Sequence, residues 1–277
     1  MKHALSTHLF VNHRLTTALL DRIRHAGIDA VEIFCARQHF DWTNHAQVAE
    51  LAHWFRDSEL TLHSLHAPIY SDEVWGRSGP NSVIDITESS KVRRMAGVDE
   101  IKRALELADH VPLRYLVQHV GVGSEEYDER KTEAAFCSLE ELVVFSRQRG
   151  VEVLLENIPN ALSSARRLVQ FIGVTHLNLG FCFDTGHAHM EEGGIPPAFE
   201  LLRERIRSTH VHDNNGTDDQ HVWPFLGESG TIDWCRTMGL LRSCGDQFPL
   251  VLELKEDPER KHPIDDVVAI FERLENL

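Results

Sequence analysis

The segment STHVHDNNGTDDQH, residues 208–221, holds three histidines and three aspartates within fourteen residues. A turn uses Asn, Gly and Asp, but it does not require His210, His212 and His221 beside them. Imidazole nitrogens together with carboxylate oxygens, and without thiolates, suit Mn²⁺, Zn²⁺, Mg²⁺ or Fe²⁺. The segment therefore predicts ligands for a divalent metal ion.

Two glutamates lie inside apolar runs, Glu156 in VLLEN and Glu253 in LVLELK. An unpaired buried carboxylate costs several kcal/mol or takes up a proton, so it persists where a cation compensates it. The cation is either a metal ion or, in a purely structural salt bridge, Lys255 or Arg166. The two glutamates therefore add carboxylates to the candidate metal site.

The motif FDTGHAH, residues 183–189, places Asp184 and His187 on either side of Gly186. Glycine is expected here to permit a tight turn that points both side chains inward. The alternative is that Asp184 caps the following helix. In HVH, strand alternation puts His210 and His212 on one face, so one is expected to bind the metal with the other behind it.

Apolar, β-branched runs alternate with amphipathic stretches along the chain, which predicts eight strand–helix units. The expected strands are 4–10, 29–34, 60–66, 113–120, 151–157, 177–184, 206–212 and 249–255. This pattern predicts an α/β fold, a single (β/α)8 TIM barrel that spans residues 1–277 as one domain. A doubly wound open sheet is the alternative, but no G-x-G-x-x-G follows the first strand.

A barrel gathers functional groups at the carboxyl ends of its strands. Nearly all the metal-binding side chains follow or end an expected strand, from the third to the eighth. The predicted metal ligands are His66, His119, Glu156, Asp184, His187, His210, Asp219, His221 and Glu253.

Composition limits the classes of function. The 277 residues are 42% hydrophobic and carry a net charge of −15, which disfavours nucleic acid as a partner, although a local basic patch would outweigh the total. No apolar stretch is long enough to cross a membrane, and no signal peptide is visible, so a cytoplasmic location is expected. The five scattered cysteines are expected to be reduced.

Taken as a set, the motifs resemble the xylose-isomerase-like TIM barrels, which include sugar-phosphate isomerases and epimerases and the endonuclease IV type of abasic-site nuclease. The resemblance runs from the DAVEIF strand to Glu253. It is carried by LHAP (65–68), QHVG (118–121), LLEN (154–157), FDTGHAH (183–189), HVHDN (210–214), DQH (219–221), LGESGTIDW (226–234) and VLELK (251–255).

The resemblance implies one of two metal sites. In the ketose epimerases a single ion, often manganese, is held by two glutamates, an aspartate and a histidine, which correspond to Glu156, Glu253, Asp184 and His210, with His187 near the substrate. In endonuclease IV nine ligands hold three zinc ions, and the nine metal ligands named above match that set.

The first hypothesis is an isomerase or epimerase of a sugar or another small hydroxy-carbonyl compound, with no organic cofactor. Glu156 and Glu253 would be the acid–base pair, and a divalent metal would lower the cost of an enediolate. The segment 71–82 is a candidate lid, in which Trp75 would stack on a sugar and Arg77 would meet a carboxylate or phosphate. Dehydratase or lyase chemistry through the same intermediate stays open.

The second hypothesis is an endonuclease IV-like phosphodiesterase that acts on abasic-site DNA. DNA binding requires basic residues along the rim, but the expected rim loops are mixed or acidic, and Arg37 and Gln38 are the best candidates for a contact. The third hypothesis is a metal-binding scaffold without catalytic activity. The sequence leaves the substrate, its phosphorylation, the metal, the number of ions and the oligomeric state open.

Overall fold

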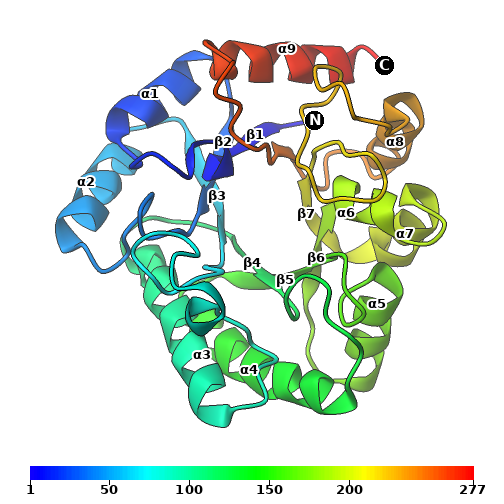
Figure 1. The fold of residues 1–277 in the computed structure, drawn as a ribbon. Coiled ribbons are helices and arrows are strands. Elements are labelled where there is room, and N and C mark those ends of the chain that lie inside the picture. Colours follow the sequence, from blue (N-terminus) through cyan, green and yellow to red (C-terminus); the bar gives the residue numbers. More distant parts are fainter.

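A computed structural model describes residues 1–277 and shows eight parallel strands inside a ring of helices (Figure 1). The expected (β/α)8 barrel is therefore confirmed. The strands are β1 (His3–Ser6), β2 (Ala30–Phe34), β3 (Thr61–His66), β4 (Tyr115–His119), β5 (Glu152–Glu156), β6 (Gly180–Asp184), β7 (Ile206–His210) and β8 (Leu250–Leu252).

The sheet runs in the order β7-β6-β5-β4-β3-β2-β1-β8, and every pair of neighbours in that order is parallel. Its two ends meet just beyond β7. There the Val211 N–H donates to the Val251 carbonyl at 2.8 Å, and the Glu253 N–H donates to the Val211 carbonyl at 3.2 Å. These contacts nearly close the barrel and exclude the alternative open sheet.

Helices follow the strands and pack on the outside of the barrel (Figure 1). The helices are α1 (Thr17–His25), α2 (His45–Arg56), α3 (Lys91–Leu105), α4 (Glu129–Arg147), α5 (Ala165–Val174), α6 (Thr185–Met190), α7 (Ile195–Leu202), α8 (Trp234–Arg242) and α9 (Pro263–Glu275). Short 3₁₀ helices are η1 (Thr7–Phe10), η2 (Gly79–Ser82), η3 (Glu106–Asp109) and η4 (Arg203–Arg205). No helix has both the length and the apolarity needed to cross a lipid bilayer.

Many helices begin at a side chain that accepts a hydrogen bond from the first turn. Asn44 caps α2, Asp128 caps α4 and Asp233 caps α8 in this way. Each cap satisfies a backbone N–H that has no partner within the helix. The buried faces of these helices then join a hydrophobic core of 67 residues between the sheet and the helical ring.

The first strand is shorter than expected, because residues 7–10 leave the sheet as η1. The Ser6 hydroxyl accepts a hydrogen bond from the His8 N–H, and the Thr7 hydroxyl accepts one from the Phe34 N–H at 3.0 Å. These bonds turn the chain over the mouth of the barrel. His8 consequently lies at the rim and not in a strand.

Candidate metal centre

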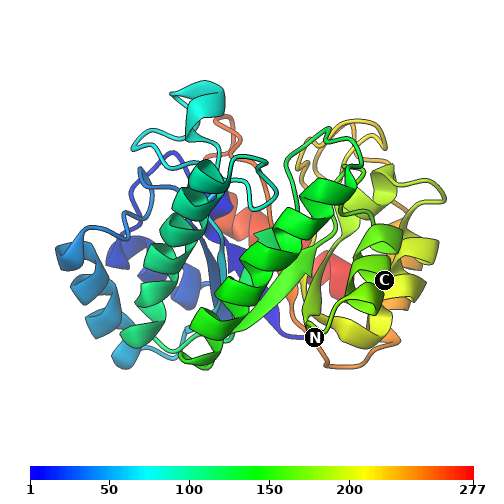
Figure 2. The same ribbon diagram turned by 90° about the horizontal axis from the view of Figure 1, so that it is seen from below.

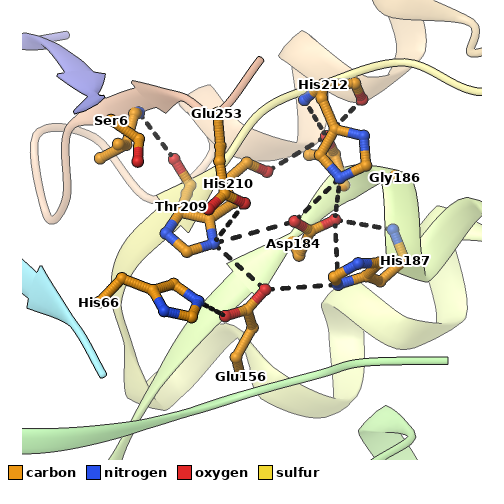
Figure 3. A network of polar contacts seen from close by, with 12 residues as sticks. Ser6, His66, Glu156, Asp184, Gly186, His187, Thr209, His210, His212 and Glu253 are labelled. Atoms are coloured by element: carbon orange, nitrogen blue, oxygen red, sulfur yellow. Dashed lines mark hydrogen bonds and ion pairs between the residues drawn. The ribbon is translucent and has the colours of Figure 1, made fainter. Parts of the chain in front are cut away.

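Four buried side chains from four strands converge at the carboxyl rim of the barrel. Glu156 ends β5, Asp184 ends β6, His210 ends β7, and Glu253 follows β8. One ligand atom from each lies within 4.8 Å of the others. The Nδ1 atom of His210 is 3.2 Å from Glu156 Oε1 and 3.2 Å from Glu253 Oε2 (Figure 3). We call these residues the central group.

The central group contains buried polar atoms that the protein itself leaves without hydrogen bonds, Nδ1 of His210 and Oε1 of Glu156. All three carboxylates have only imidazoles as ion-pair partners, so neither Lys255 nor Arg166 compensates them. Buried carboxylates require a compensating cation, and three carboxylates with one imidazole suit a divalent metal ion. The residues present therefore fit a metal ion.

A second group adjoins the central group through Glu156. The Oε2 atom of Glu156 lies 3.1 Å from His119 Nε2 and 3.5 Å from His66 Nε2, and the two imidazole nitrogens are 3.2 Å apart. His66 ends β3 and His119 ends β4, so neighbouring strands supply all three side chains. Glu156 thus faces the central group with Oε1 and the second group with Oε2.

A third group consists of His187, His212, Asp219 and His221. Asp219 Oδ2 is 3.3 Å from His187 Nε2, and Asp219 Oδ1 is 3.2 Å from His221 Nε2. The rings of His212 and His221 stack with centroids 3.9 Å apart. All nine residues that the sequence singled out as metal ligands therefore lie in one of the three groups, with His212 as a tenth member. Their role as ligands stays a prediction.

Burial and charge oppose each other across these groups. Burial alone would raise the pKa of Glu156, but His210 and His119 hold it well below its usual range. Burial would lower the pKa of His210, yet the surrounding anionic groups raise it well above its usual value. The pKa of His221 likewise rises to about 9, because its hydrogen bond to Asp219 outweighs burial. A metal ion would displace protons from these imidazoles.

Sequence reasoning missed Glu32, which lies in β2 below the central group and is fully buried. Its carboxylate oxygens lie 3.0 and 3.2 Å from His210 Nε2, and the Ser64 hydroxyl donates to it at 2.8 Å. Burial would raise the pKa of Glu32, but His210 lowers it to about 2. This contact holds the imidazole so that Nδ1 faces Glu156 and Glu253. The sequence signal that could have identified Glu32 is its position as a carboxylate inside the apolar run DAVEIF.

Gly186 has a different role from the one expected. It lies in α6 without the positive φ that a tight turn would require. A Cβ atom there would lie 2.0 Å from Cε1 of His212, so glycine leaves space for this ring. Asp184 caps α6 by accepting a hydrogen bond from the His187 N–H at 2.7 Å, while its carboxylate also lies 3.1 Å from His212 Nε2. Capping and membership of the central group are therefore compatible.

We expect Gly186→Ala to lower the free energy of unfolding by about 1–3 kcal/mol, because the methyl group displaces the His212 ring. Urea unfolding measures the change. Gly239→Ala is the matched control, since its Cβ in α8 would meet nothing within 4 Å and should raise stability by up to about 1 kcal/mol. Equal stability of Gly186→Ala and the wild type would contradict the close approach.

A cavity of about 690 Å³ opens above the three groups. Trp75 lines it, and Phe34 and His8 form part of the same wall. Arg77 is exposed and does not line the cavity. The segment 71–82 rises beyond the rim opposite the N-terminus (Figure 2, cyan), and a bridge between Tyr70 and Val83 closes its base.

The two candidate DNA contacts are engaged within the protein. The side-chain amide of Gln38 donates to the Val11 carbonyl at 2.9 Å and accepts from the Trp75 N–H at 3.1 Å. Arg37 contacts Asp41 and Thr43. Both side chains therefore have hydrogen-bond partners within the protein.

Fold and site together define a parallel (β/α)8 barrel with histidine, aspartate and glutamate groups at its carboxyl rim. The family model of the xylose isomerase-like TIM barrel matches residues 20–275, and the chain belongs to this family.

A relative in Methanocaldococcus jannaschii, an uncharacterized protein, is 30% identical over 268 residues, which cover 92% of this chain and 84% of that protein. The crystal structure of a D-tagatose 3-epimerase-like protein has a TM-score of 0.76 at 24% identity and covers 100% of this chain and 96% of that one. The IOLI protein with a binding zinc atom has a TM-score of 0.76 at 17% identity and covers 99% and 96%. The two structural likenesses show the shared fold.

Proposed function

We propose that the protein is a divalent-metal-dependent isomerase or epimerase of a sugar or a related small hydroxy-carbonyl compound. The observation that carries this proposal is the central group, in which Glu156 and Glu253 are buried on either side of His210 Nδ1. Membership of the xylose isomerase-like family and the likeness to an epimerase-like structure support it. The zinc atom of the IOLI protein supports a metal in this fold.

Glu156, Asp184, His210 and Glu253 would hold the metal ion. When bound, a divalent ion polarises a carbonyl oxygen and stabilises negative charge that develops on it. The four side chains would hold it at the base of the cavity, below the wall that contains Trp75. Mn²⁺ and Zn²⁺ are the first choices for this donor set.

Proton transfer would be the task of the two glutamates. One carboxylate removes a proton from the carbon beside the carbonyl, and the other returns a proton on the opposite face or at the neighbouring carbon. Return on the opposite face epimerises the substrate, whereas return at the neighbouring carbon isomerises it. The low pKa of Glu156 keeps its carboxylate ionised, as metal binding requires.

The three adjacent groups favour one second candidate, a metal-dependent phosphodiesterase of the endonuclease IV type. All nine residues of that ligand set converge here. The engaged side chains of Arg37 and Gln38 and the acidic rim weigh against DNA as the substrate. An assay of the purified protein on abasic-site DNA tests this candidate. Nicking of the DNA that EDTA abolishes would contradict the isomerase proposal.

We expect the double variant Asp219→Ala/His221→Ala to retain one tightly bound equivalent of metal, because the central group contains neither residue. Elemental analysis after exhaustive dialysis measures the content. Asp218→Ala is the control, since its side chain bonds only to Asn215 and Thr217. Loss of a tight equivalent in the double variant, but not in the control, would indicate a multinuclear centre and favour the phosphodiesterase.

A further inference from the structure

The side chains of the cavity wall offer a phosphate group few partners. Among the residues that line the cavity, Lys255 is the only lysine and there is no arginine. Four carboxylates line it, those of Glu156, Asp219, Glu253 and Glu256. Proteins bind phosphate with arginine forks, lysines or clustered backbone N–H groups. A metal ion at the base would offset some of this negative charge. The wall above it offers a phosphate group only one cationic side chain of the lysine or arginine type, Lys255.

The glycine-rich stretch that lines the cavity is not available to an anion either. Gly121 and Gly123 flank Val122, whose N–H already donates to Glu125 Oε2 at 3.1 Å. A Cβ atom on Gly121 would lie 2.9 Å from that same oxygen. Glu125 also forms an ion pair with Lys131. The protein's own carboxylate therefore occupies the place that a phosphate group would take in this loop.

His8 offers the cavity a polar side chain with an unpartnered nitrogen. The residue is 8% exposed and lines the cavity, and its Nδ1 is buried without a hydrogen-bond partner in the protein. An imidazole has a nitrogen that can donate a hydrogen bond and one that can accept, which suits a hydroxyl group. A buried polar group without a partner is costly, so a ligand that supplies one gains affinity.

The surroundings of His8 suit a sugar ring. Its imidazole lies 4.7 Å from the Phe34 ring and 5.9 Å from the Trp75 ring, both centroid to centroid. His221 of the third group is 5.1 Å away on the same measure. Aromatic faces pack against the C–H groups of a sugar, while a nearby polar atom orients one hydroxyl.

Resting on the proposed function, we propose that the cavity takes an uncharged polyhydroxy compound and not its phosphate ester. His8 is a specificity residue that hydrogen-bonds one of the hydroxyl groups. This assignment narrows the substrate class of the site and gives a role to a side chain that belongs to none of the three ligand groups.

Calorimetric titration of the metal-loaded full chain with D-fructose and D-fructose 6-phosphate tests the charge preference. We expect the free ketose to bind at least about tenfold more tightly, because the wall offers the ester one lysine and no arginine. Glu125→Gln should improve binding of the ester and leave binding of the free ketose unchanged. A wild type that binds the ester as tightly as the free ketose, or binds neither probe, would overturn the proposal.

His8→Phe tests the hydroxyl contact, since it keeps the ring shape and removes both nitrogens. We expect it to weaken D-fructose binding roughly five- to tenfold and His8→Gln to restore part of the loss. His53→Phe is the control, because His53 is exposed on α2 and does not line the cavity. Unchanged affinity in His8→Phe would overturn the role of His8.

Metal analysis of the same samples separates the two proposals. His8→Phe should hold as much metal as the wild type, because His8 is in no ligand group. Protein that binds D-fructose without holding metal would remove the proposed function and leave the charge preference standing. Protein that holds metal but prefers the phosphate ester would overturn the charge preference and leave the proposed function standing. In that case Lys255→Met should reduce binding of the ester.

Discussion

Glu156→Gln is expected to lower the turnover of a converted sugar by about 10²–10⁴-fold, because it removes a carboxylate that transfers the proton. The same change should reduce metal content more than Glu253→Gln does. Glu156 presents one oxygen to the central group and the other to His66 and His119, whereas Glu253 belongs to the central group alone. Steady-state kinetics and elemental analysis of the two variants measure both effects.

Glu152→Gln provides the control for this prediction. Glu152 lies on the same strand, β5, but at its amino end, away from the rim. The control should retain the wild-type metal content and turnover. A Glu156→Gln variant that keeps both would remove the acid–base assignment and the shared role of Glu156.

Glu32→Gln is expected to weaken zinc binding by about 10–100-fold, although Glu32 belongs to no ligand group. Its carboxylate accepts from His210 Nε2 and so presents Nδ1 to the metal. Glu32→Ala should also lower the free energy of unfolding of the metal-free protein by about 3–5 kcal/mol, because it leaves a buried histidine without its partner. Competition with a zinc chelator measures the first effect, and urea unfolding in EDTA measures the second.

Ser64→Ala is expected to produce a smaller loss of zinc affinity than Glu32→Gln. The Ser64 hydroxyl donates to Glu32, so its loss should weaken zinc binding in the same direction but by less. Wild-type zinc affinity in Glu32→Gln would show that His210 needs no support from β2. A loss of stability without a loss of affinity would reduce Glu32 to a packing role.

Strand patterns in the sequence were sufficient to predict the fold and the rim at which the candidate ligands gather. Apolar runs that end in His66, Glu156 or Asp184 predict both the strand and the rim where its last side chain lies, because a parallel barrel puts all carboxyl ends on one side. The first strand was predicted too long, since THLF is as apolar as a strand. Only the hydrogen bonds of Ser6 and Thr7 turn it into η1.

Other features have no local signal. The sequence around Gly186 predicts a turn. In the structure the absence of a side chain at Gly186 leaves space for the ring of His212, which lies 26 residues further along the chain. His8 reads as part of a strand, yet it stands in the cavity wall. Glu32 carried the same signal as Glu156, a glutamate in an apolar run, but its position below His210 depends on the register between β2 and its neighbours.

The sequence by itself determined the donor types, their places at strand ends and the barrel that collects them, because strand alternation and apolar periodicity are local properties of the chain. The grouping of donors was decided by the tertiary structure. Glu156 meets His119 through the pairing of β4 with β5, and Glu253 reaches His210 only because β8 returns to β7 and closes the ring. Closure is a property of all eight strands at once, so no single segment encodes it.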